Sequence, residues 1–80
     1  MDTISAVKNR ILQLCGERNI SVNRLASISA LPPSSVKNIL YGKSQNPTLL
    51  TIKMLCDGLG ITLGEFFSTP EFDALEQEIR

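Results

Sequence analysis

The sequence predicts an all-α fold: a compact five-helix domain followed by a sixth, short C-terminal helix. Two observations support this prediction. Apolar residues recur three and four positions apart along most of the 80 residues, which is the period of a helix that buries one face. Residues that start or stop helices separate these apolar stripes, and no segment shows the alternation typical of a strand.

The first helix is expected to run from a cap at Asp2 or Thr3 to about Arg18, because both side chains can accept a hydrogen bond from a free N–H of the first turn. Leu12 lies off the apolar stripe of this helix, and we expect it to pack against a later element. The stripe itself consists of Ile4, Val7, Ile11, Leu14 and Cys15.

Residues 21–42 are predicted to form two short helices joined by a tight break. Ser21 is a candidate N-cap for the first of them. A residue before a proline is pushed out of the helical region, so this helix must end by about Leu31, before Pro32. Pro33 can occupy the first position of the next helix, and Gly42 is expected to end it as a C′ residue. The apolar side of this helix comprises Val36, Ile39 and Leu40, and its polar side comprises Ser34, Lys37, Asn38 and Tyr41.

Three more helices are expected after a polar loop at residues 43–47. Thr48 can cap the fourth helix and Gly60 can end it, and Thr62 and Glu65 have the spacing of a capping box that opens a fifth helix with Phe66 and Phe67. The predicted core stripe of the fourth helix is Leu49, Ile52, Leu55, Cys56 and Leu59. The last helix is expected from about Pro70 to Ile79, and its apolar row is Phe72, Leu75 and Ile79. This row either packs on its own domain or forms a dimer contact, and both alternatives stay open.

Composition and charge indicate one small globular domain with a polarised surface. The formal net charge is zero. Residues 1–53 nevertheless hold seven basic and two acidic residues, a net charge of +5, whereas residues 54–80 hold one basic and six acidic residues, a net charge of −5. One basic end is compatible with DNA binding, although a salt-bridged surface with incidental clustering is the alternative.

The sequence also predicts where the protein resides and whether its cysteines are paired. No apolar run has the roughly 18 residues of a membrane span, and no secretory signal begins the sequence, so we expect a cytoplasmic protein without a membrane partner. Cys15 and Cys56 could form a disulfide, but both lie inside apolar stripes, and we expect buried free thiols.

No pattern in the sequence predicts an enzyme. Histidine is absent, which removes the commonest general base and the commonest metal ligand. The two cysteines lack the spacing of a zinc site, and Ser34-Ser35 has no base that could activate a nucleophile. The acidic residues near the C-terminus have the pattern of a solvated face. We therefore expect no catalytic residue, cofactor, metal or small-molecule substrate.

Several short motifs in register give the chain its resemblance to a known family. They are Leu25-Ala26, residues 31–36, residues 38–43, Asn46-Pro47 and residues 59–67. With these motifs the chain resembles the lambda-repressor-like (Cro or Xre-type) helix-turn-helix family of DNA-binding regulators, in particular its short stand-alone members. The resemblance covers about Ile4 to Phe67. It implies a DNA-binding domain at residues 1–67, with the helix-turn-helix at about 21–42, followed by a C-terminal helix at 68–80 as a possible dimer contact.

The resemblance also implies roles for individual residues on double-stranded DNA. The helix after the turn would lie in the major groove, with Ser34, Ser35, Lys37 and Asn38 nearest the base edges. The sugar-phosphate backbone would be contacted by Ser21, Asn23, Tyr41, Lys43, Ser44 and Asn46. An asparagine can read adenine through two hydrogen bonds and a lysine can donate to guanine, so Asn38 and Lys37 have suitable chemistry. A phosphate contact is the alternative for Lys37.

Three residues depart from the family pattern. The family often has a phosphate-binding glutamine where this chain has Val22, a glycine in the turn where it has Ala30, and a polar base-reading residue where it has Pro33. The first expected function is a sequence-specific transcriptional regulator, a homodimeric repressor that acts by occupying its operator. The second is a protein-interaction module on the same scaffold, such as an antitoxin or an adaptor, with little base reading.

Overall fold

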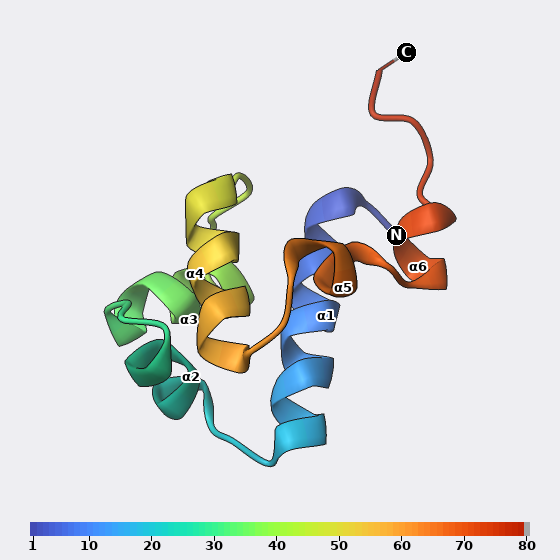
Figure 1. Ribbon diagram of the computed structural model, residues 1–80. Coiled ribbons are helices and arrows are strands. Elements are labelled where there is room, and N and C mark those ends of the chain that lie inside the picture. The colour runs from blue at the N-terminus through green and yellow to red at the C-terminus, as the bar shows by residue number, and fades with distance from the viewer. Residues whose placement is uncertain (80) are drawn as a thin grey trace.

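The computed structural model describes residues 1–79, and they form an all-helical domain without a strand. The predicted fold class and the predicted order of helices are confirmed (Figure 1). The six helices are α1 (Thr3–Arg18), α2 (Val22–Ile28), α3 (Pro33–Tyr41), α4 (Leu49–Leu59), α5 (Leu63–Phe67) and α6 (Pro70–Asp73).

Four of the helices begin at the predicted N-caps. In α1 the carboxylate of Asp2 accepts a hydrogen bond from the Ser5 N–H at 2.9 Å. The Ser5 side chain and then this backbone N–H lower the pKa of the Asp2 carboxyl, because both stabilise the ionised form. The hydroxyl of Ser21 caps α2 and that of Thr48 caps α4. In these helices local chemistry determines where the chain turns into a helix.

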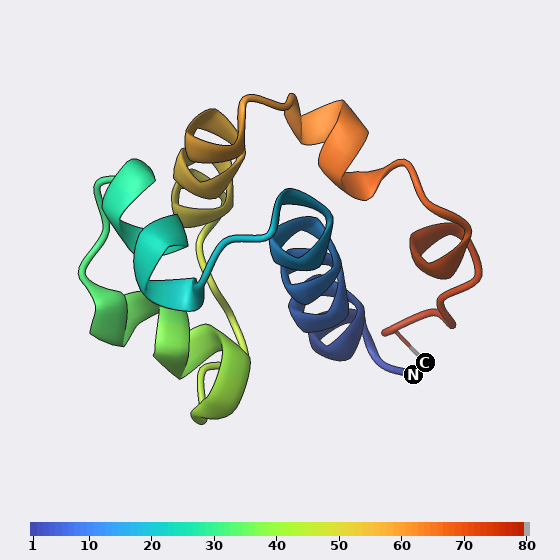
Figure 2. The ribbon, with the colours of Figure 1, turned by 90° about the horizontal axis from the view of Figure 1, so that it is seen from below.

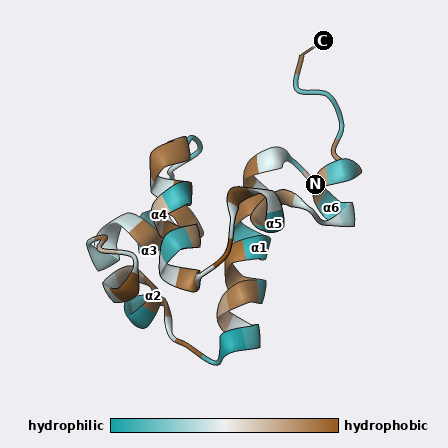
Figure 3. Cartoon of the chain, viewed as in Figure 1, coloured by the Kyte–Doolittle hydropathy of each residue, from teal (hydrophilic) through white to brown (hydrophobic). Residues whose placement is uncertain are grey.

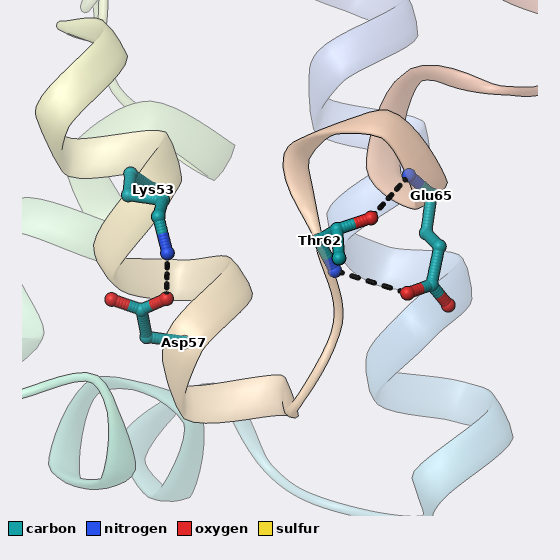
Figure 4. Close-up of polar contacts among 4 residues, drawn as sticks. All are labelled: Lys53, Asp57, Thr62 and Glu65. Atoms are coloured by element: carbon teal, nitrogen blue, oxygen red, sulfur yellow. Dashed lines mark hydrogen bonds and ion pairs between the residues drawn. The ribbon is translucent and has the colours of Figure 1, made fainter.

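The start of α5 is a complete capping box, as the sequence predicts. The Glu65 N–H donates to the hydroxyl oxygen of Thr62 at 3.0 Å, and the Thr62 N–H donates to the Glu65 carboxylate at 3.2 Å (Figure 4). Two backbone N–H groups that a helix start leaves free are thereby satisfied.

The helices surround one core. Viewed along two directions, α2, α3 and α4 lie on one side of α1, and α6 lies on the other side (Figures 1 and 2). Hydrophobic and hydrophilic residues alternate along each of the longer helices (Figure 3), and the buried apolar residues form one cluster. The largest fully buried side chains come from five different helices: Ile11, Leu25, Val36, Leu55, Cys56 and Phe66. Because one face of α3 is buried in this core, the opposite face of α3 points away from the domain.

A single arginine joins α1 to the end of α5. The Arg10 guanidinium donates to the carbonyl oxygen of Phe66 at 2.7 Å and to that of Glu65 at 2.8 Å. Carbonyl groups at a helix C-terminus have no partner within the helix, so a planar donor fork is well suited to them. Arg10 is therefore a structural residue, a role that its place in the sequence does not predict.

Two predicted packing positions are wrong. Leu49 was placed in the core stripe of α4, but its side chain is 64% exposed. It occupies the first position of α4, whose first turn lies beyond α2 and α3 at the end of the bundle (Figure 1). Leu12, which was expected to pack against a later element, is 41% exposed.

The last helix is much shorter than predicted. It ends at Asp73 and not at Ile79. The N–H of Leu75 donates to the carbonyl of Phe72 at 3.3 Å, three residues back, so the final turn is tightened and does not continue as an α-helix. Short helices need a buried face to be stable in water, and only Phe72 of the predicted row is packed against the core. Ile79, at the far end of the row, is 82% exposed.

Candidate nucleic-acid interface

The turn between α2 and α3 places the two helices against each other. After Ser29 the chain reverses through Ala30, whose φ of 56° is left-handed, and the Leu31 N–H closes the turn on the Ala26 carbonyl at 3.0 Å. Pro32 is extended, as a residue before a proline should be, and Pro33 takes the first position of α3. The predicted helix–turn–helix within residues 21–42 is thus present in the structure.

The two faces of α3 are separated as the periodicity predicts. Val36, Ile39 and Leu40 are buried behind it. On the front, the four side chains predicted to read bases line one shallow open depression together with Tyr41 and Gly42: Ser34, Ser35, Lys37 and Asn38. Ser35 is half-buried at its edge, whereas Ser34, Lys37 and Asn38 are exposed. The residues expected to read bases therefore share one surface.

The residues assigned to the DNA backbone are distributed over two segments. Ser21 and Asn23 are exposed at the first turn of α2, where the Ser21 oxygen already accepts the Arg24 N–H at 3.0 Å. The other segment follows α3: Tyr41 is 68% exposed, Lys43 and Asn46 are exposed, and Ser44 is half-buried.

Asn46 is set apart from the other predicted interface residues. It lines a separate hollow with the first turn of α1, which includes Asp2 and Thr3, and not the depression on α3. The structure therefore does not bring Asn46 together with the base-reading residues.

Residues 1–53, which carry the net charge of +5, supply fewer unpaired positive charges than their seven basic residues suggest. Arg10 is occupied with carbonyl groups of α5, and Lys53 forms an ion pair with Asp57 one turn further along α4 (Figure 4). Lys37 and Lys43 are exposed in and beside the depression. Arg24, one residue after Asn23 on α2, is also exposed, although the sequence predicts no specific role for it.

The C-terminal candidates for a dimer contact have different environments. The ring of Phe72 lies 5.0 Å from that of Phe67 and 6.1 Å from that of Phe66, centroid to centroid, so it packs on its own domain. Leu75 is half-buried and Ile79 is exposed. Within residues 1–79, Ile79 is the member of the predicted row whose apolar surface is mostly exposed, and Leu75 is partly covered.

The cysteines are buried and unpaired, as expected. Burial raises the pKa of the Cys15 thiol and of the Cys56 thiol, because the thiolate would lose its hydration. Among residues 1–79, no three side chains of the types that ligate metals lie close enough to hold an ion. No helix in this part of the chain has the length and apolar character to cross a bilayer.

Comparisons with known proteins agree with this geometry. The family model of the Cro/C1-type HTH DNA-binding domain matches residues 10–71. Among solved structures, the crystal structure of the prophage Lp1 protein 11 is similar, with a TM-score of 0.80 and 32% sequence identity. The alignment covers 94% of this chain and all of that one. No curated protein sequence gives a significant match. The chain belongs to the family of Cro/C1-type helix-turn-helix DNA-binding domains.

Proposed function

We propose that the protein is a sequence-specific transcriptional regulator that represses by occupying an operator. The observation that carries this proposal is the division of α3, which has a buried apolar back and an exposed front of short hydrogen-bonding side chains. A helix of this kind fits the major groove, where base edges present distinct donors and acceptors. The assigned base readers are Ser34, Ser35, Lys37 and Asn38.

Contacts to the sugar-phosphate backbone would fix the register of α3. Ser21 and Asn23 on α2, together with Tyr41, Lys43, Ser44 and Asn46 after α3, are the proposed residues for this role. Each phosphate that a lysine or arginine neutralises releases counterions, so the affinity should fall with salt, with a slope of about −0.9 per phosphate. Affinity that stays flat between low and moderate salt would contradict the proposal.

A protein-interaction module on the same scaffold is the second candidate. The zero net charge favours it, as do Val22 in place of a phosphate-binding glutamine and the engagement of Arg10 and Lys53 within the chain. Selection of bound fragments from random DNA separates the two functions. An enriched motif supports the regulator, and no enrichment at any salt concentration supports the interaction module.

We further propose that the protein acts as a homodimer. Two copies of α3 would then enter successive major grooves roughly 34 Å apart on a near-palindromic site. The proposed contact consists of Phe72, Leu75 and Ile79. Changing Phe72 would also disturb the core, because its ring packs on Phe66 and Phe67. The sharper test is therefore sedimentation of a variant with Leu75→Ser and Ile79→Ser, and a mass equal to that of the wild type would exclude this contact.

A further inference from the structure

Gly42, the residue after α3, lies directly against Asn38. Its N–H donates to the Asn38 carbonyl oxygen at 3.1 Å, the last bond of the helix. Gly42 ends α3, as predicted, and its φ of −97° and ψ of −156° are those of an extended backbone. An extended backbone of this kind does not require glycine. A different constraint must explain why a side chain does not fit at this position.

The constraint is the space that Asn38 occupies. A Cβ atom added at Gly42 would overlap the side-chain amide oxygen of Asn38 and would lie 2.8 Å from the Asn38 carbonyl oxygen. Carbon and oxygen atoms that are not bonded do not approach so closely without displacing each other. At Gly60, the glycine that ends α4, an added Cβ meets no atom within 4 Å. The absence of a side chain at Gly42 thus leaves room for the amide of Asn38.

The amide that occupies this space is exposed, and it has no hydrogen-bond partner in the described part of the chain. The Asn38 side chain takes part in none of the side-chain hydrogen bonds within residues 1–79. Bidentate reading of adenine uses both the amide oxygen and the amide nitrogen, so both must remain unpaired in the free protein. A side chain with fewer rotamers open to it before binding also loses less conformational freedom when it binds.

We propose that Gly42 is a specificity-determining positioning residue, which lets the Asn38 amide lie over the end of α3 in the orientation that reads a base. This inference rests on the proposed function, because it assigns base reading to Asn38. It does not require Gly42 to touch DNA. A side chain at Gly42 would move the amide and alter base preference even where the helix and its phosphate contacts stay intact.

The test compares the wild type with Gly42→Ala on the motif selected from random DNA. The measured quantity is the ratio of affinities for the selected site and for sites with one base pair changed. We expect Gly42→Ala to lower this ratio about 5- to 150-fold at the same base pair as Asn38→Ala, which is the range for one good base contact. Because the two residues act as a unit, the double variant should discriminate no worse than Asn38→Ala alone.

Gly60→Ala is the matched control, because it also changes a glycine that ends a helix. It should lower the melting temperature, since Gly60 has a φ of 72°, and leave the base preference unchanged. If Gly42→Ala keeps the wild-type ratio at the Asn38 base pair, or lowers discrimination equally at all base pairs, the inference is overturned. A wild type without any enriched motif would instead refute the proposed function.

A measurement on the wild type alone does not depend on how the variant folds. NMR of the free protein should find the Asn38 side-chain amide restricted to one rotamer, whereas the exposed Asn23 amide should be averaged. An Asn38 amide as mobile as that of Asn23 would contradict the positioning role.

Discussion

At the scale of single residues, the turn between α2 and α3 contains a local strain. Ala30 has a φ of 56°, a conformation that costs an ordinary residue roughly 1–2 kcal/mol because its Cβ approaches the carbonyl oxygen. The family resemblance implies a glycine at this position, which would adopt the same conformation without that penalty. The alanine at position 30 thus carries a strain that the glycine implied by the resemblance would not have.

Replacing Ala30 by glycine should stabilise the protein. The removed strain exceeds the extra backbone entropy that glycine loses on folding, so the free energy of unfolding should rise by about 0.5–1 kcal/mol. Chemical denaturation measures this change. Asn19→Gly is the matched control, because Asn19 has a φ of 54° but asparagine tolerates it better, and the gain there should be smaller. A destabilised Ala30→Gly variant would show that the turn is not strained.

At the scale of elements, two helical glycines have opposite surroundings. Gly58 in α4 lies against the end of α2, where an added Cβ would overlap the Ser29 hydroxyl and lie 2.9 Å from the Ile28 carbonyl oxygen. Gly16 in α1 has open space around its position. The close approach of α4 to α2 therefore depends on Gly58, whereas α1 gains no packing from Gly16.

The two corresponding alanine variants should change stability in opposite directions. Gly16→Ala should raise the free energy of unfolding by about 0.5–1 kcal/mol through helix propensity alone. Gly58→Ala should lower it by about 1–3 kcal/mol, because overpacking outweighs the same propensity gain. Thermal and urea unfolding of the pair provide the comparison. Equal stabilisation of both variants would mean that α2 and α4 can separate without cost.

The link between α1 and α5 gives a second prediction at this scale. Arg10→Lys should lower the free energy of unfolding by about 1–3 kcal/mol, since a lysine cannot donate to both the Glu65 and the Phe66 carbonyl groups in the geometry of the guanidinium fork. Arg24→Lys is a control of the same chemistry at an exposed position, and it should change stability little. If both variants unfold at the same urea concentration as the wild type, the link is not structural.

At the scale of the whole molecule, the sequence correctly predicts the features that depend on interactions between residues close together in the chain. The caps at Asp2, Ser21, Thr48 and Thr62 act on N–H groups of their own first turns, so their chemistry is visible in the sequence. The two faces of α3 follow in the same way from the helical period.

The features that the sequence does not predict depend on residues far apart in the chain. Arg10 bonds to carbonyl groups 55 and 56 residues away. Gly58 is constrained by Ser29, and the exposure of Leu49 depends on where the neighbouring helices end. The apolar row after Phe72 has a helical pattern, but Leu75 is only half-buried and Ile79 is exposed, so little burial supports a longer helix. The position of Asn46 away from the α3 depression likewise depends on how the loop meets α1.

The division between base-reading and phosphate-binding residues is the central claim for the whole molecule. The most direct test measures the affinities of the wild type, Asn38→Ala and Lys43→Ala for the selected site and for random DNA. Asn38→Ala should weaken binding to the selected site by about 1–3 kcal/mol and leave binding to random DNA unchanged. Lys43→Ala should weaken both alike and reduce the salt slope by about one. Equal effects of the two substitutions on selected and random DNA would contradict the claim.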